Sequence, residues 1–208
     1  MQLSSASQSY INIVDTDAII GYVAGKLFSL FCHQDPSILL QIDGKYLLLC
    51  PRCCGLHLGF LISLIFFSAG QVKRSRFAGP IPFVMVVGGF LWLALDWTLG
   101  QTSFYQASTL SRFGSGIAAG SSFSVLYLVY FRNYLKPTEH SALFTVRSLL
   151  GTICLALVVS WVLFLTKSWR FITISMVVVF LINLLLVCYA VFQRLRSLLK
   201  INLKMNMP

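Results

Sequence analysis

Residues 37–49 read Ser37-Ile38-Leu39-Leu40-Gln41-Ile42-Asp43-Gly44-Lys45-Tyr46-Leu47-Leu48-Leu49. Two β-prone runs flank Asp43-Gly44, and such a dipeptide between apolar runs is the strongest short-range signal for a β-hairpin. A hairpin here would turn the chain back on itself. It would bring Cys32-His33, which precedes the first run, beside Cys50 and Cys53, which follow the second.

The hairpin therefore organises a cluster of thiols and imidazoles. Four of the six cysteines and two of the three histidines lie between residues 32 and 57, in the segments Cys32-His33-Gln34 and Cys50-Pro51-Arg52-Cys53-Cys54-Gly55 and at His57. Most of the remaining chain is apolar. A chain of this kind has little reason to collect these side chains in one place unless they bind or react with something.

The composition is that of an integral membrane protein. The chain has 208 residues, of which 57% are hydrophobic and 11% are charged, and its mean hydropathy is +0.81. These values lie outside the range of an ordinary soluble domain. The net charge of +10 does not indicate nucleic-acid binding, because the basic residues sit in short loops and at the tail, where membrane orientation explains them.

The chain is expected to form an all-α membrane bundle with about five transmembrane helices, an N-terminal interfacial helix and a short β-hairpin. A bilayer core needs about 20 apolar residues per helix, and five stretches approach that length: 53–70, 80–99, 113–131, 143–165 and 171–192. Residues 10–31 form a further helical stretch, but Asp15, Asp17 and Lys26 interrupt it. We expect that stretch to lie in the interface or to be tilted.

These segments make one membrane domain over residues 1–208. It comprises the interfacial helix at 10–31, the Cys/His hairpin at 32–54, the bundle at 53–192 and a basic cytoplasmic tail at 193–208. Within the bundle, Gly116-x-x-x-Gly120 predicts that a neighbouring helix approaches closely. Cys154 and Cys188 fall within apolar spans and are expected to be small buried hydrophobic residues.

Loop charges predict the orientation. If five spans alternate, one side of the membrane receives nine basic residues: Lys73, Arg74, Arg76, Arg132, Lys136, Arg194, Arg196, Lys200 and Lys204. The other side receives only Arg112, Lys167 and Arg170. The positive-inside rule then places the C-terminus in the cytoplasm and the Cys/His hairpin on the extracytoplasmic face. The expected location is a bacterial inner membrane.

The cysteine spacing favours a metal site of the zinc type. Cys50-x-x-Cys53 has the spacing of a zinc knuckle, in which two thiolates hold one tetrahedral ion. Cys32 supplies a third thiolate, and a histidine would be the fourth ligand. His33 is adjacent to Cys32, which makes joint ligation difficult, whereas His57 shares a helix face with Cys53 at i and i+4. Zn–S bonds of about 2.3 Å require the sulfurs to lie within about 4 Å of one another.

Two other interpretations use the same atoms. A Cys-x-x-Cys pair at a helix N-terminus near Arg52 favours the thiolate and suits a membrane thiol–disulfide redox protein, and an extracytoplasmic face permits disulfides. A disulfide or a zinc ion could also serve only to hold the hairpin on the bundle.

Asp96 and Arg112 are candidate catalytic residues beside this cluster. A carboxylate near the end of an apolar span is costly and is commonly functional. The second span ends at Asp96 and the third begins at Arg112, on the same side as the hairpin in the predicted topology. Three segments thus converge, as an active site requires, although an ion pair between Asp96 and Arg112 would also explain both residues.

The motif residues resemble a known membrane family. The pattern Cys32-His33-Gln34, Cys50-x-Arg52-Cys53-x-Gly55 with Gly59, then Asp96, Gln101, Arg112 and Gly116 is similar to the family catalogued as domain of unknown function 2085, over roughly residues 25 to 125. The resemblance carries no activity with it. It implies that these positions belong to one site.

The sequence thus predicts a polytopic membrane protein with an extracytoplasmic zinc-type site. The site would suit a metal-dependent enzyme acting on a membrane-associated anionic substrate, with Asp96 as base or ligand and Arg112 holding the anion. A redox protein and a non-enzymatic subunit or assembly factor of a larger membrane complex are the alternatives. The expected partners are the lipid bilayer and such a complex, with no nucleic acid.

Overall fold

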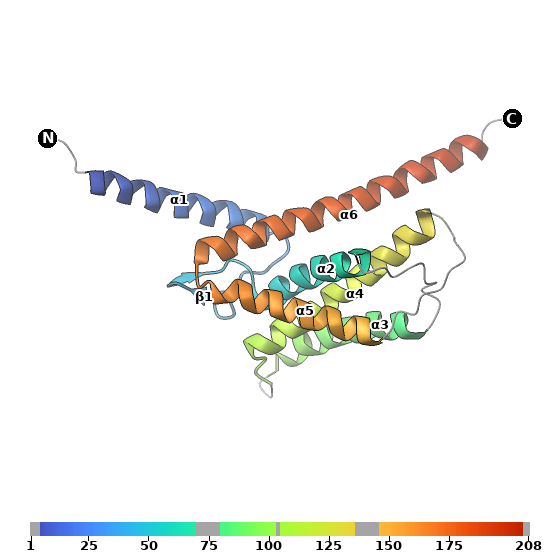
Figure 1. Ribbon diagram of the computed structural model, residues 1–208, viewed down its shortest axis with the longest axis horizontal. Helices are drawn as coiled ribbons and strands as arrows, with labels where there is room; N and C mark the ends of the chain where they lie inside the picture. The colour runs from blue at the N-terminus through green and yellow to red at the C-terminus, as the bar shows by residue number, and fades with distance from the viewer. Residues whose placement is uncertain (1–4, 70–79, 103–104, 136–145, 206–208) are drawn as a thin grey trace.

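The computed structural model describes residues 5–69, 80–102, 105–135 and 146–205 (Figure 1). Over these ranges the chain forms six helices and one two-stranded hairpin: α1 (Ser5–Phe28), β1 (Gln41–Ile42), β2 (Lys45–Tyr46), α2 (Pro51–Ala69), α3 (Pro80–Leu99), α4 (Thr109–Leu135), α5 (Val146–Leu165) and α6 (Trp169–Met205). The helical fold class is confirmed. Each of the six predicted helical stretches overlaps one observed helix.

The local sequence explains where the helices begin. Pro51 and Pro80 are the first residues of α2 and α3, a position where proline loses no hydrogen bond. Ser108 precedes α4 and accepts a hydrogen bond from the Ser111 amide at 3.1 Å, as an N-cap serine does. Ser168 precedes α6 in the same way.

Five membrane spans are not confirmed. Among the described residues, one helical stretch is long and apolar enough to cross a bilayer, Trp169–Arg196 in α6, with a mean hydropathy of 2.8. The apolar stretches of α2, α3 and α5 are shorter, at Pro51–Phe67, Val86–Leu99 and Gly151–Leu165. At about 1.5 Å of rise per residue, these stretches do not reach the roughly 30 Å of a bilayer core.

The predicted hairpin is confirmed, but its strands are short. Gln41 pairs with Tyr46 and Ile42 with Lys45 in an antiparallel register. Asp43 and Gly44 between them have φ angles of 53° and 73°. Two successive left-handed residues make the type I′ turn that suits the twist of a hairpin, and the ladder ends after two residues on each side.

Glycines bring α2 and α4 into backbone contact, as the small-residue pattern predicted. A Cβ added at Gly116 would lie 2.1 Å from the Arg52 carbonyl oxygen, and one at Gly120 would lie 2.1 Å from that of Leu56. Only glycine permits this approach. In Figure 1, α2 runs along α4, and α3 lies on the other side of α4.

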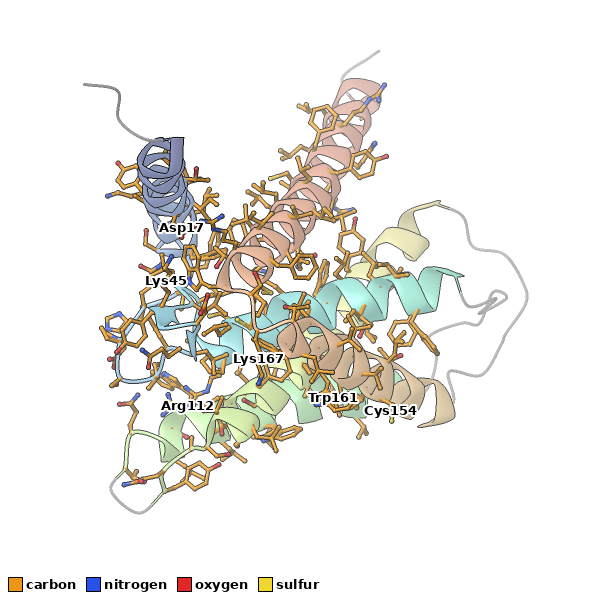
Figure 2. All side chains as sticks on the ribbon, turned by 60° about the vertical axis from the view of Figure 1, so that its left-hand side comes forward. Asp17, Lys45, Arg112, Cys154, Trp161 and Lys167 are labelled. Atoms are coloured by element: carbon orange, nitrogen blue, oxygen red, sulfur yellow. The ribbon has the colours of Figure 1, made fainter. Side chains whose placement is uncertain are left out.

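In Figure 1, α1 and α6 lie above this bundle, and the hairpin lies at its left end, close to the start of α6. The Trp169 indole donates to the Tyr46 carbonyl at 2.9 Å, and Asp17 of α1 pairs with both Lys45 and Arg170. Figure 2 shows Asp17 and Lys45 together at this end of the molecule. The polar contacts hold α1 and the hairpin against the start of α6.

Many large apolar side chains on α3, α5 and α6 are exposed, among them Phe83, Trp161 and Leu185. Cys154 and Cys188 are also exposed, not buried as expected, because they lie on outward faces of α5 and α6. Such continuous apolar exposure suits contact with lipid. The basic residues Lys73, Arg74, Arg76 and Lys136, on which the predicted orientation depends, lie outside the described residues.

Candidate metal centre

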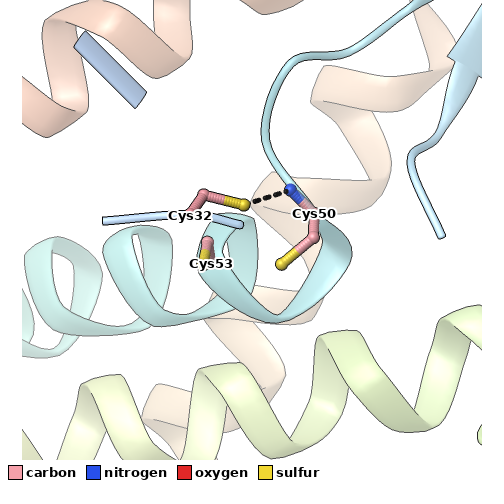
Figure 3. Close-up of side chains that lie close together, drawn as sticks. All are labelled: Cys32, Cys50 and Cys53. Atoms are coloured by element: carbon pink, nitrogen blue, oxygen red, sulfur yellow. Dashed lines mark hydrogen bonds between the residues drawn. The ribbon is translucent and has the colours of Figure 1, made fainter. Parts of the chain in front are cut away.

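Three cysteines from separate parts of the chain meet at the hairpin. Cys32 follows α1, Cys50 immediately precedes α2 and Cys53 lies in the first turn of α2. Their sulfur atoms all lie within 4.8 Å of one another, slightly farther apart than the 4 Å expected of a zinc site, and Figure 3 shows the three side chains around one point. They are close enough to hold a metal ion.

The loop that carries Cys32 is held by its neighbour Gln34. This residue adopts a left-handed conformation with φ of 54°. Its side-chain Nε2 donates to the Gly25 carbonyl at 3.0 Å and to the Leu48 carbonyl at 2.9 Å. Gln34 thus joins the end of α1 to the segment after the hairpin, and it fixes the turn on which Cys32 sits.

Hydrogen bonds converge on the Cys32 sulfur. The Cys50 amide donates to Cys32 Sγ at 3.3 Å (Figure 3). Hydrogen bonds from the Cys50 and Cys53 thiols, and then from the Cys50 and Gln34 amides, lower the pKa of the Cys32 thiol. The hydrogen bond to Cys32 and burial raise the pKa of the Cys50 thiol. Cys32 is therefore the preferred thiolate of the cluster.

The site lies within the protein core. Cys32 and Cys50 are buried, at 5% and 9% exposure, whereas Cys53 is half-buried. Phe28, Leu47 and Leu49 pack in the same core cluster. Apolar walls exclude water from two of the thiols, and Cys53 marks the more open side.

Neither predicted histidine ligand belongs to the group of three. Among the described side chains, the cluster within 4.8 Å contains only cysteines. His33 is exposed. His57 is half-buried, its ring packs on Phe180 at 5.1 Å between centroids, and its Nδ1 lies 3.3 Å from Asn183 Nδ2.

Asp96 is buried in a separate polar network. Arg52 Nε and Nη2 each lie 2.6 Å from Asp96 Oδ2, and Ser115 Oγ donates to the same oxygen at 3.2 Å. Ser111 Oγ and Tyr105 OH donate to Oδ1 at 2.5 and 3.4 Å. Both carboxylate oxygens are occupied, and the network joins α2, α3 and α4.

The partner of Asp96 is therefore Arg52, not Arg112. Arg52 also donates from Nη2 to the Asp96 carbonyl at 2.8 Å. Arg112 is half-buried and donates from Nε to the Ala107 carbonyl at 3.2 Å. Hydrogen bonds from Ser37 are the main cause of the lowered pKa of Asp35, and the charge of Arg112 adds to it, so Arg112 lies near the loop that begins with Cys32. Figure 2 places Arg112 at the hairpin end of the molecule.

Sequence reasoning missed the roles of Gln34 and Arg52, although both belong to the motif segments. The sequence did indicate that Arg52 is near the site, because it lies between Cys50 and Cys53 and therefore in the first turn of α2. The signal for Gln34 was weaker, because a left-handed glutamine is uncommon.

Three thiols in this arrangement support two kinds of chemistry. Thiolates are soft ligands that select zinc, copper(I) or iron–sulfur centres. Two of the three could alternatively form a disulfide. In the described ranges all six cysteines are free, and the metal type is not decided by the donor set.

Two relatives align with about half of the chain. A protein of Methanothermobacter thermautotrophicus is 24% identical over 99 residues, which cover 48% of this chain and 86% of the relative. One of Methanocaldococcus jannaschii is 27% identical over 103 residues, which cover 50% of this chain and 64% of the relative. Both carry the description "uncharacterized protein". No solved structure matches.

A family model matches the part of the chain that contains the cysteine cluster. It matches residues 32–126, a segment that begins at Cys32 and holds Cys50, Cys53, Asp96 and Arg112. The resemblance drawn from the motif residues is thus confirmed: this segment matches the family described as "Predicted membrane protein (DUF2085)".

Proposed function

We propose that the protein is a membrane protein in which Cys32, Cys50 and Cys53 hold a zinc-type metal ion. The convergence of their sulfur atoms within 4.8 Å, from both sides of the hairpin, carries the proposal. The amide hydrogen bond to Cys32 Sγ supports it, because a thiolate ligand is stabilised by backbone N–H donors. Tetrahedral zinc has thiolates about 3.8 Å apart, so small side-chain rotations complete the geometry.

The number of protein ligands favours a reactive site over a purely structural one. Structural zinc sites have four protein ligands, whereas catalytic sites have three and leave one position for water or substrate. The described part of the chain offers three donors in this cluster. A metal bound there would lower the pKa of a bound water or polarise a substrate oxygen.

Arg112 is the residue that we assign to an anionic substrate group. It lies near the Cys32 loop, and only its Nε has a described hydrogen bond, to the Ala107 carbonyl. A guanidinium provides the planar set of donors that carboxylate and phosphate groups favour. A membrane-associated substrate, such as a lipid with an anionic headgroup, would present such a group at this surface.

Asp96 acts on the site indirectly in this proposal. Since its two oxygens accept hydrogen bonds from Arg52, Ser111, Ser115 and Tyr105, it has little freedom to serve as a base or ligand. It holds Arg52, and through Arg52 it positions the turn between Cys50 and Cys53.

The lipid bilayer is the surrounding medium of the proposed protein. The apolar stretch of α6 and the exposed apolar faces support insertion. The loop charges favour a cytoplasmic C-terminus and an extracytoplasmic metal site. Membership in a larger membrane complex stays a prediction.

Metal analysis of the purified full chain in detergent tests the proposal. We expect about one zinc per chain, and a loss of that zinc in Cys32→Ser, Cys50→Ser and Cys53→Ser. Cys188→Ser is the matched control, because Cys188 is exposed on α6 and should keep the metal. A folded, fully reduced protein that binds no metal after incubation with zinc would overturn the proposal.

The thiol–disulfide alternative has one observation in its favour, the placement of Cys50 and Cys53 at the N-terminus of α2, where the helix dipole stabilises a thiolate. Mass spectrometry of protein alkylated during non-reducing isolation distinguishes the two functions. Three alkylated thiols favour the metal site, whereas a Cys50–Cys53 disulfide favours redox chemistry.

A further inference from the structure

An apolar pocket lies beside the metal centre, between α2, α4 and α6. Its volume is about 270 Å³, near the lower end of the range for small-molecule sites. Phenylalanine side chains dominate its lining: Phe31, Phe60, Phe123 and Phe180. The polar members of the lining are His57 and Asn183.

Asn183 carries an unusual unsatisfied atom. The residue lies near the middle of the apolar stretch Trp169–Arg196 and is 5% exposed. Its Nδ2 donates to the His57 carbonyl at 2.9 Å, which fixes the orientation of the amide. Its Oδ1 is buried and has no hydrogen-bond partner among the described residues.

The role of Asn183 as a link between helices accounts for its Nδ2 donor but not for its Oδ1 acceptor. A polar residue in an apolar span often hydrogen-bonds to a neighbouring helix, and the Nδ2 contact with α2 is of this kind. The acceptor Oδ1 remains, and a buried acceptor without a partner is costly. Since Asn183 lines the pocket, a ligand that carries a donor can supply the missing bond once a small movement of the neighbouring side chains uncovers Oδ1.

The lining also indicates the shape of the ligand. Aromatic side chains favour a flat ring, which can stack or meet them edge to face. Phe180 already makes an edge-to-face contact with the His57 ring, with centroids 5.1 Å apart. Val187 and Phe123 are about half exposed, at 47% and 44%, so one wall of the pocket reaches the apolar surface. A ligand can therefore enter from the bilayer.

We propose that this pocket binds a lipid-soluble aromatic compound bearing a hydroxyl group, whose O–H donates to Asn183 Oδ1. The ring lies among the phenylalanines, and any hydrocarbon tail extends past Val187 into lipid. The proposal does not rest on the metal, because the pocket and the cysteine cluster share no lining residue.

Two small probes test the proposal by calorimetry on the full chain in one detergent. They are 2-naphthol, which has the hydroxyl donor, and 2-methoxynaphthalene, which has the same ring without it. We expect the wild-type protein to bind 2-naphthol about five- to tenfold more tightly, the worth of one hydrogen bond to a buried acceptor. Asn183→Leu should lose that preference and retain ring binding.

A second pair of variants separates the pocket from partitioning into detergent. Val187→Phe fills the pocket and should abolish saturable binding of both probes. Val191→Phe makes the same change on the same helix, at an exposed residue outside the lining, and should bind as wild type. Equal affinity of the two probes for wild type, or unchanged binding in Val187→Phe, would overturn the proposal.

Discussion

The Arg52 guanidinium and the Asp96 carboxylate form a buried ion pair, with Arg52 Nε and Nη2 each 2.6 Å from Asp96 Oδ2. The side chain of Asp96 is 1% exposed and that of Arg52 is 13% exposed. Because Arg52 lies between Cys50 and Cys53, the pair connects the cysteine cluster to α3. The stability of the bundle and the geometry of the site therefore both depend on this ion pair.

Asp96→Asn should therefore destabilise the protein and weaken metal binding. Removing one partner of a buried ion pair costs about 3–5 kcal/mol, because the other charge remains buried without compensation. Thermal unfolding in detergent measures the first effect, and zinc titration measures the second.

Asp43→Asn is the control for this change. Asp43 is exposed in the hairpin turn, with φ of 53°, and Asn-Gly also favours that turn. We expect no loss of stability there. Equal unfolding midpoints for Asp96→Asn and Asp43→Asn would show that the ion pair contributes little.

Gln34→Ala should weaken zinc binding by about tenfold, since residues that orient metal ligands typically contribute 10- to 100-fold in affinity. The substitution removes both side-chain hydrogen bonds that hold the Cys32 loop. Competition with a zinc chelator measures the affinity. Ser29→Ala, which removes only an exposed hydrogen bond to Lys26, should keep the wild-type value; a loss of the same size there would point to general loosening of the segment.

Gly120→Ala should lower the unfolding midpoint, because its Cβ would lie 2.1 Å from the Leu56 carbonyl oxygen. Forcing extra atoms into a packed contact typically costs about 1–3 kcal/mol. Gly88→Ala is the matched control in α3, where a Cβ meets nothing within 4 Å. It should be neutral or slightly stabilising, since alanine favours the helix. If Gly120→Ala and Gly88→Ala have the same unfolding midpoint, the contact between α2 and α4 is less tight than described.

Acid should loosen the attachment of α1. Hydrogen bonds from Arg170 and Lys45 lower the pKa of Asp17 below its ordinary 3.8. A carboxyl whose pKa is depressed on folding contributes stability above its unfolded pKa and loses it as the pH falls through the folded pKa. We therefore expect no change above about pH 5 and a progressive loss below about pH 4.

Fluorescence of Trp169 can follow this transition, since its indole bonds to Tyr46 and Lys45 lies over its ring. Asp17→Asn should show weaker attachment at neutral pH and a smaller dependence on acid. If the fluorescence of Asp17→Asn depends on pH in the same way as that of the wild type, a titratable group other than Asp17 causes the transition.

The sequence predicted well the features that depend on local chemistry. Asp43-Gly44 specified the turn, because few dipeptides accept two left-handed residues in succession. Apolar runs bounded by proline, serine and charged residues located the six helices. The turn also predicted that Cys32 and Cys50 lie close together, so the core of the site could be inferred from the hairpin.

The features that depend on side-chain direction were not predictable in this way. His57 is one helical turn from Cys53, yet it faces Phe180 and Asn183 of α6, a partner distant in sequence. Arg112 was the expected arginine partner of Asp96, whereas the observed pairing with Arg52 depends on how closely the glycines let α2 approach α4. The five predicted membrane spans are not confirmed, since an apolar run can serve as a core helix as well as a membrane helix.

The glycine contact between α2 and α4 has a mechanical consequence. Cys50 and Cys53 are held firmly against the bundle, because the carbonyl of Arg52, which lies between them, packs closely on Gly116. Cys32 instead sits on a loop held by the two hydrogen bonds of Gln34. If a ligand is gained or lost at the three sulfurs, we therefore expect Cys32 and the end of α1 to be displaced more than Cys50 and Cys53.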